Sequence, residues 1–241
     1  MLQRRKPLED RETEVWDLPV RVFHWIVVVS IVGAFVTHRL GVDYFALHSF
    51  FGYVLLVAVA FRIIWGFTGS YHARFGSFLK GPRQTLVYFG DLLARRHRPF
   101  AGHNPLGALM VLTLLILLSA QAVTGLFADD EIMNTGPLSA TVSSEWSLFL
   151  TSIHRRLFYV IAAAAGVHVI AVLAHSILFK EKLILSMITG RKPVEPFVGV
   201  EPYSNQKLLT LRAVVLCVIL TIALVVLLLY ATPHSAATSD I

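Results

Sequence analysis

The sequence contains few cysteines and few charged residues, and each shortage excludes classes of protein. One cysteine, Cys217, occurs in 241 residues. A single thiol excludes an internal disulfide, a four-thiolate iron–sulfur cluster and the Cys-x-x-Cys-His attachment of a covalent haem. Charged residues make up 15% of the chain, whereas soluble domains carry about 25%. Because the apolar residues are also gathered into long runs, the composition favours an integral membrane protein.

Five apolar runs are long enough to cross a bilayer, for which a helix needs about 20 mainly apolar residues. They cover residues 20–37, 45–68, 106–128, 150–179 and 208–230. We therefore predict an all-α integral membrane protein with a four-helix transmembrane bundle and a fifth, C-terminal transmembrane helix. The expected domains are a leader at residues 1–19, the four-helix domain at 20–192, and a linker, the fifth helix and a short external tail at 193–241. The mixed apolar and basic stretch at residues 82–95 is either an interfacial helix or a polar connector.

The basic residues indicate how the chain crosses the membrane. Most of the 21 lysines and arginines lie in the leader, between the second and third runs, or between the fourth and fifth runs. Cytoplasmic loops of membrane proteins carry the excess of Lys and Arg, so these three segments are predicted to be cytoplasmic. The N-terminus then lies in the cytoplasm and, after five spans, the C-terminus lies outside. The net charge of +6 is thus a topology signal, and no nucleic-acid partner is predicted.

Four histidines fall at two depths of the predicted bundle. His154 and His168 lie 14 residues apart in the fourth run, and such a separation rises about 21 Å and returns within about 40° of the same helix face. His24 lies near the cytoplasmic end of the first run, so it meets His168 at the inner level. His48 lies near the outer end of the second run, so it meets His154 at the outer level.

Two facing imidazoles at each level are the donor set that bis-histidine ligation of haem iron requires. We therefore predict two non-covalent b-type haems that form an electron path across the bilayer. Interhelical hydrogen bonds between the same histidines are the structural alternative, and a zinc site is disfavoured because the ligands form two distant pairs. His38 lies 14 residues after His24 and also reaches the outer level, so spacing alone leaves His38 and His48 as rival outer ligands.

Four stretches of the chain combine residues that are specific to one family. They are VWDLPVRVFHW at residues 15–25, His48-x3-Gly52-Tyr53 with Arg62 and Trp65-Gly66, GHNPLG at residues 102–107, and His154 and His168 followed by M-x-T-G-R at residues 187–191. Over residues 15–192 the chain thereby resembles the bacterial cytochrome b-561 / nickel–iron hydrogenase b-type cytochrome family.

This resemblance implies two b haems in a four-helix bundle of the bacterial inner membrane, where the outside C-terminus predicted from the basic residues would be periplasmic. It also implies electron transfer between the quinone pool and a periplasmic redox protein or enzyme subunit, and it assigns the outer-ligand role to His48. Two features depart from the family pattern. Many relatives have an acidic residue after His154, where this chain has Arg155, and the fifth helix lies outside the four-helix pattern.

Haem propionates need cationic partners, and four arginines are placed to supply them. The candidates are Arg21, Arg62, Arg155 and Arg156. Arg21 shares a helix face with His24, and Arg62 lies 14 residues after His48, at the inner level. The other two directly follow His154. Snorkelling toward lipid headgroups is the alternative for all except Arg62.

Two further positions near the predicted ligands have alternative interpretations. Gly52 follows His48 by one helical turn and either admits the porphyrin to the backbone or serves small-residue helix packing. His175 lies seven residues after His168, about 10 Å further along the helix. It is either an ordinary interfacial histidine or a group that exchanges protons with quinone, and His103 has the same two interpretations.

The leading hypothesis is a di-haem b-type cytochrome that carries electrons across the membrane, in which the protein sets haem ligation and spacing. Its predicted ligands and partners are quinone, membrane lipid and a periplasmic redox partner. A stand-alone superoxide:quinone oxidoreductase is the alternative within this class. From another class, a haem-free membrane anchor or transporter subunit is the rival, although transporters often show inverted repeats and broken helices and the sequence shows neither.

Overall fold

The computed structural model describes residues 12–96, 100–193 and 205–237. The first eleven residues of the predicted leader, most of the predicted linker and the last four residues of the predicted tail lie outside the described residues. The chain divides into two compact units. The first comprises Met1–Val22, Ile64–Leu112 and Gly166–Leu211, and the second comprises Phe23–Ile63, Thr113–Ala165 and Arg212–Ile241.

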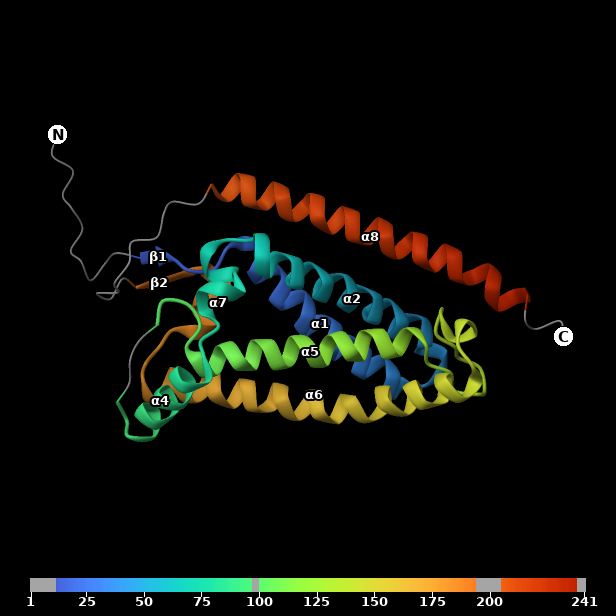
Figure 1. Cartoon of the computed structure of the whole chain (residues 1–241), viewed down its shortest axis with the longest axis horizontal. Coiled ribbons are helices and arrows are strands. Elements are labelled where there is room, and N and C mark those ends of the chain that lie inside the picture. Colours follow the sequence, from blue (N-terminus) through green and yellow to red (C-terminus); the bar gives the residue numbers. More distant parts are fainter. Residues whose placement is uncertain (1–11, 97–99, 194–204, 238–241) are drawn as a thin grey trace. The chain divides into compact units, whose positions relative to one another are not determined.

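All five predicted spans are helices. They are α1 Leu18–Leu40, α2 Phe45–Thr68, α5 Pro105–Leu126, α6 Ser144–Leu178 and α8 Gln206–Ala237 (Figure 1). Each contains a window with a mean hydropathy between 2.0 and 3.2, and large apolar side chains such as Val29, Ile116 and Ile170 are exposed on them. Helices satisfy their own backbone hydrogen bonds and tolerate apolar exposure only against lipid. The protein is therefore an all-α, multi-pass membrane protein, as predicted.

The helix ends follow from local capping residues. α1 starts after Asp17, whose carboxylate accepts a hydrogen bond from the Val20 amide at 2.7 Å. α5 starts after Asn104, whose side-chain oxygen accepts a hydrogen bond from the Gly107 amide at 2.7 Å. Pro105 occupies the first position of α5, where a missing N–H costs nothing. Both starts could be read from the sequence, since Asp and Asn are preferred capping residues.

α6 is longer than the predicted span at residues 150–179. It begins at Ser144, just after Ser143, whose hydroxyl accepts a hydrogen bond from the Trp146 amide at 3.4 Å. Its 35 residues rise about 52 Å, well beyond a hydrocarbon core of about 30 Å. Hydropathy finds only the apolar part of such a helix and not the polar turns that a cap adds. α8 also runs beyond the predicted residues 208–230.

Short elements occupy the connections between the long helices. They are β1 Glu12–Glu14, η2 Val42–Tyr44, η3 Tyr71–Ala73, α3 Phe75–Phe78, α4 Pro82–Leu93, η4 Ser139–Thr141, α7 Leu183–Thr189 and β2 Arg191–Pro193. α4 covers the stretch for which an interfacial helix or a connector was expected. It is helical, and its Leu86 and Leu93 are both 70% exposed, which favours the interfacial helix.

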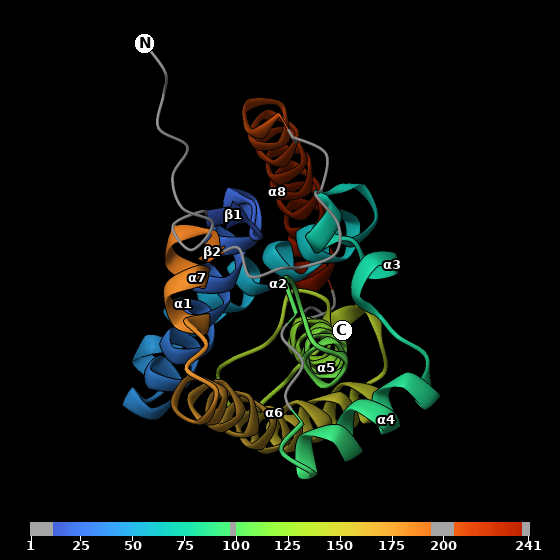
Figure 2. The ribbon, with the colours of Figure 1, turned by 90° about the vertical axis from the view of Figure 1, so that its left-hand side faces the viewer.

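In the first unit, the segment before α1 is joined to the segment after α7. β1 and β2 pair in antiparallel fashion, with Glu14 opposite Arg191 (Figure 2). The amides of Val15 and Trp16 both donate to the Gly190 carbonyl, at 2.9 and 3.1 Å. Gly190 ends α7 with a φ of +84°, and a Cβ there would lie 2.7 Å from the Trp16 carbonyl oxygen. Both the conformation and the contact therefore require glycine.

Asp17 is a buried carboxylate in the first unit. Its side chain is 3% exposed, and besides the Val20 amide it accepts a hydrogen bond from Trp65 Nε1 at 3.0 Å. The Trp65 side chain is 1% exposed. Each of these buried polar groups thus has the hydrogen-bond partner that a buried polar group needs. Asp17 therefore holds the start of α1 against the end of α2.

In the second unit, parts of α1, α2, α5 and α6 pack together. The rings of Phe35 on α1 and Phe158 on α6 stack with centroids 5.1 Å apart. Gly33 on α1 lies against the Phe51 ring of α2, where a Cβ would be 2.5 Å from a ring carbon. Ile161 on α6 is 2% exposed. Glycine at residue 33 thus allows a close helix contact, as small residues do between transmembrane helices.

We expect the buried Tyr88 hydroxyl to make the protein sensitive to alkali. Burial, reinforced by the Glu181 carboxylate, raises the pKa of Tyr88 to about 12, so the unfolded chain loses this proton first. The contribution of this proton to the free energy of unfolding is therefore fully present below about pH 10. About 2–3 kcal/mol of it is lost as the pH rises from about 10 to about 12. Tyr88→Phe removes this loss and leaves stability at neutral pH nearly unchanged, because the hydroxyl has no hydrogen-bond partner within the described chain. Thermal unfolding of both proteins at neutral and alkaline pH checks this, and equal alkaline losses would contradict it.

Candidate functional site

The structure places two of the predicted ligands, His48 and His154, next to each other in the second unit. His48 lies on α2 and His154 lies on α6, and their ring centroids are 6.2 Å apart with an angle of 85° between the planes. An imidazole nitrogen binds a metal at about 2.0–2.1 Å, and the ring centre lies about 1 Å beyond it, so imidazoles on opposite sides of one metal have centres roughly 6 Å apart. The observed separation therefore fits a single iron between the two rings.

A backbone carbonyl holds the second nitrogen of each ring. His48 Nδ1 donates to the Ala34 carbonyl of α1 at 2.9 Å, and His154 Nδ1 donates to the Gln121 carbonyl of α5 at 3.0 Å. A proton on Nδ1 leaves the lone pair on Nε2, and metal-binding histidines commonly donate their other N–H to a carbonyl in this way. Both rings therefore have the tautomer that a metal ligand needs.

Three residues of α5 lie next to His154. None of them was among the site residues predicted from the sequence. Thr124 Oγ1 lies 3.3 Å from His154 Nδ1, and Gln121 Nε2 lies 3.3 Å from His154 Nε2. A Cβ on Gly125 would lie 3.0 Å from His154 Cε1, so glycine permits the ring to approach the helix. Gln121 did carry a signal, because an amide inside an apolar run is a functional candidate by default.

We expect Gly125→Ala to weaken haem binding at the predicted His48–His154 site without unfolding the protein. The added methyl group would press on the His154 ring from 3.0 Å and tilt it away from its present orientation. Changes in the groups that orient a metal ligand typically cost 10–100-fold in metal affinity, and we expect a loss of that order in haem affinity. Haem titration of the purified protein measures it. Gly90→Ala is the matched control, because no atom lies within 4 Å of a Cβ at that exposed helical position; equal effects of the two variants would contradict the role of Gly125.

His38, the rival outer ligand, also lies beside His48. Their ring centroids are 5.8 Å apart with an angle of 53° between the planes, and His38 occupies the last turn of α1. The described residues provide no hydrogen bond that holds the His38 ring, whereas carbonyls hold both His48 and His154. This difference favours His48 as the partner of His154.

The two members of the predicted inner pair belong to different units. His24 lies on α1 in the second unit, and His168 lies on α6 in the first. The His24 ring meets the Trp25 ring edge-on, with centroids 5.1 Å apart. On α6, no atom lies within 4 Å of a Cβ placed on Gly166, two residues before His168. The pairing of His24 with His168 stays a prediction.

The four predicted arginines occupy different settings. Arg21 Nη1 donates to the Ile188 carbonyl in the last turn of α7, where a cation also stabilises the helix C-terminus. Arg62 on α2 is buried within the protein, at 3% exposed. Arg155 and Arg156 are exposed on α6. Contact of any of the four with a propionate stays a prediction.

Gly52 has open space beside it, one helical turn after His48. No atom lies within 4 Å of a Cβ built at this position. Small-residue packing would bring a neighbouring helix against the glycine, so the interpretation as a helix contact loses support. The open face next to a candidate ligand fits the approach of a flat porphyrin. Together with the two imidazoles, it makes this part of the second unit fit for a haem.

Known proteins match this chain over most of its length. Residues 15–190 match the family model described as prokaryotic cytochrome b561. A protein of Rhizobium leguminosarum bv. viciae is 27% identical over 220 residues, which cover 78% of this chain and 91% of the relative. One of Bradyrhizobium diazoefficiens is 26% identical over 209 residues, covering 74% and 85%, and one of Cupriavidus necator is 23% identical over 216 residues, covering 75% and 86%.

Each of these three relatives is named as a probable Ni/Fe-hydrogenase B-type cytochrome subunit. No solved structure matches the chain significantly. The family model spans most of the sequence, and the structure supplies the transmembrane helices that such a cytochrome needs. The chain belongs to the prokaryotic cytochrome b561 family, whose members are b-type, electron-transferring membrane cytochromes.

Proposed function

We propose that this cytochrome carries electrons across the bacterial inner membrane between the quinone pool and a periplasmic redox partner, using two non-covalent b haems. His48 and His154 hold the outer haem iron, and His24 and His168 hold the inner one. The observation that carries the proposal is the 6.2 Å separation of the His48 and His154 rings. Its support is the Nδ1 hydrogen bond from each ring to a carbonyl, which puts the lone pair of each ring on Nε2. At His154, an iron would replace the 3.3 Å contact of Nε2 with the Gln121 amide.

The haem, when bound, supplies reversible one-electron chemistry at its iron. The Ala34 and Gln121 carbonyls hold the Nδ1 protons and so orient the ligand nitrogens. Gly52 leaves the backbone accessible to a flat group. Arg62, which is buried on α2, supplies positive charge toward a propionate. The apolar side chains of the spans exclude water from the ligand rings.

The partner is proposed from the relatives. They are named as subunits of a Ni/Fe hydrogenase, and by this likeness we propose that a hydrogenase docks on the outer side of this chain. The basic segments support a cytoplasmic N-terminus and a periplasmic C-terminus. The exposed Arg155 and Arg156 beside His154 are then available at the outer surface, either to a partner or to a small anionic electron donor such as superoxide.

A comparison of two single variants tests the outer site. We expect the purified protein to show a bis-histidine b-type signal in its reduced-minus-oxidised spectrum and to hold two haems per chain. His48→Ala should lower the content to one haem, because iron loses one of its axial ligands. His38→Ala is the matched control, since it removes a neighbouring imidazole, and it should retain both haems. A haem lost from His38→Ala and kept in His48→Ala would reverse the assignment, and a colourless wild-type protein would overturn the whole proposal.

The partner requires its own experiment. We expect a hydrogenase to co-purify with the tagged, full-length chain from mildly solubilised membranes. When hydrogen is supplied as the electron donor, the same preparation should reduce quinone only if the hydrogenase is present. Rapid consumption of superoxide by the cytochrome alone, with quinone reduction and no co-purified enzyme, would instead establish the stand-alone oxidoreductase.

A further inference from the structure

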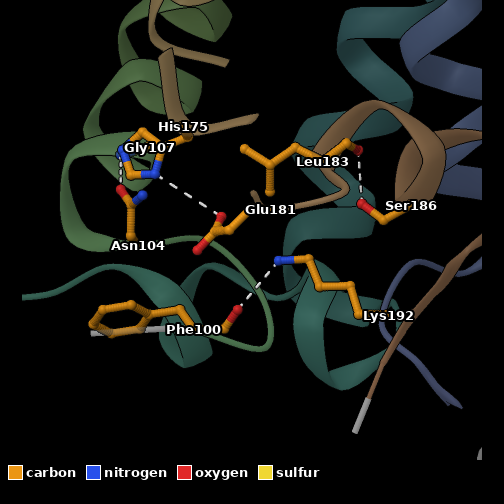
Figure 3. A network of polar contacts seen from close by, with 8 residues as sticks. All are labelled: Phe100, Asn104, Gly107, His175, Glu181, Leu183, Ser186 and Lys192. Carbon is orange, nitrogen blue, oxygen red and sulfur yellow. Dashed lines mark hydrogen bonds and ion pairs between the residues drawn. The ribbon is translucent and has the colours of Figure 1, made fainter. Parts of the chain in front are cut away.

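The first unit contains a buried polar cluster that the proposed haem ligation does not use. His175 Nδ1 lies 3.9 Å from Glu181 Oε2, and their side chains are 12% and 19% exposed. His175 occupies the last turn of α6, and Glu181 lies in the short connection between α6 and α7. Figure 3 shows the Glu181 carboxylate between the His175 ring and the Lys192 side chain.

Lys192 and Tyr88 are two titratable groups that interact electrostatically with Glu181. Lys192, on β2, donates from Nζ to the Phe100 carbonyl at 3.2 Å (Figure 3). Burial lowers the pKa of Lys192, and the Glu181 carboxylate opposes that shift. Burial and Glu181 raise the pKa of Tyr88 on α4. One carboxylate thus faces an imidazole, an ammonium and a phenol from three different elements.

The charge of this cluster depends on the imidazole at neutral pH. The Glu181 carboxylate and the Lys192 ammonium have opposite charges that cancel, and the Tyr88 phenol stays neutral. An imidazole changes its charge between about pH 5 and pH 8, so proton binding at His175 takes the cluster from neutral to positive. The carboxylate 3.9 Å away stabilises the imidazolium that forms.

The cluster lies close enough to a predicted haem ligand to respond to its redox state. His168 and His175 are both on α6 in the first unit, seven residues apart, which corresponds to about 10 Å along the helix. A unit charge at about 10 Å, with an effective dielectric constant of about 20, changes a proton affinity about tenfold. The negative charge that an added electron brings at His168 therefore favours a proton at His175.

We propose that His175 and Glu181 form a proton-binding pair whose proton affinity rises about tenfold when the haem at His168 is reduced. Such a change lets the pair take up at most about half a proton from solvent for each electron that the haem would accept, and the pair releases it on reoxidation. This proposal rests on the proposed function, since it needs a haem at His168. It adds a coupling of electron transfer to proton binding, in residues that ligate no metal.

Redox titration of the full-length protein tests the coupling. The midpoint potential of the haem that His168→Ala removes is followed between about pH 5 and pH 8, where imidazole titrates. We expect the wild-type midpoint potential to fall as the pH rises across this range. The total fall should be about 59 mV, which is the one-electron potential that corresponds to a tenfold change in proton affinity. His175→Asn should abolish most of this fall. Glu181→Gln should weaken proton binding about tenfold and move the fall to lower pH.

His72→Asn is the matched control, because it removes another imidazole of the same unit and should leave the profile unchanged. Proton uptake on reduction, measured with an indicator dye in unbuffered solution, gives a second readout, and only His175→Asn and Glu181→Gln should lower it. A purely structural role of the pair would change haem content or thermal stability and not the pH profile. If the pH dependence of the potential is unchanged in His175→Asn and in Glu181→Gln, this proposal is wrong and the proposed function still stands. If no haem is bound at His168, the proposed function itself is wrong.

Discussion

Replacing His168 with alanine is expected to remove one of two haems and to spare the other. The variant keeps the His48–His154 pair, whose rings lie 6.2 Å apart in the second unit. His24→Ala should remove the same haem, because each iron needs both of its axial imidazoles. The His24→Ala/His168→Ala double variant should lose no more than either single variant, since residues that act as one unit are not additive. Quantitative haem extraction and the reduced spectrum measure the outcome.

The comparison also tests how the four histidines are paired. His154→Ala should remove the other haem, and combining it with His168→Ala should leave a colourless chain. If His24→Ala and His168→Ala each removed a different haem, the pairing at two levels would be wrong although the haems were present. Retention of both haems in His168→Ala would remove His168 from the ligand set.

Loss of the Asp17 carboxylate is expected to cause the largest loss of stability among the polar groups described. Asp17→Ala removes the cap of α1, worth about 1 kcal/mol, and leaves the buried Trp65 N–H without its acceptor, which costs about 1–3 kcal/mol. We expect the free energy of unfolding to fall by about 2–4 kcal/mol and the melting temperature by on the order of 10 °C. Thermal unfolding in detergent, followed by circular dichroism, provides the measurement.

Matched variants separate this effect from a change in net charge. Glu14→Gln removes an exposed carboxylate from the neighbouring strand β1 and should change the melting temperature little. Trp65→Phe removes the other partner of the Asp17–Trp65 hydrogen bond, so combining it with Asp17→Ala should cost less than the sum of the two. Full additivity, or an equal loss in Glu14→Gln, would contradict the structural role of Asp17.

Several features of this protein could be predicted from local sequence alone. The five spans follow from hydropathy, because a helix in lipid must be apolar along about 20 residues. The 14-residue spacing of His154 and His168 places them on one face of one helix for purely geometric reasons. The start of α6 at Ser144 was missed, because a capped polar turn carries no hydropathy signal.

The tertiary structure decided which groups meet. Spacing put His38 and His48 at the same level, and only the packing of α1, α2, α5 and α6 sets His48 beside His154 and places a carbonyl on each Nδ1. The Ile188 carbonyl that accepts a hydrogen bond from Arg21 also lies far from it in the sequence, so only the fold brings the two together. These outcomes depend on how each helix is rotated about its axis and on the path of its connections, and neither is encoded in a local run of residues. By itself, the sequence determined an all-α membrane protein with five helices long and apolar enough to cross a bilayer, because hydropathy is a local property. Only the packing of the helices decided that His48 and His154 face each other, because that depends on contacts between distant segments.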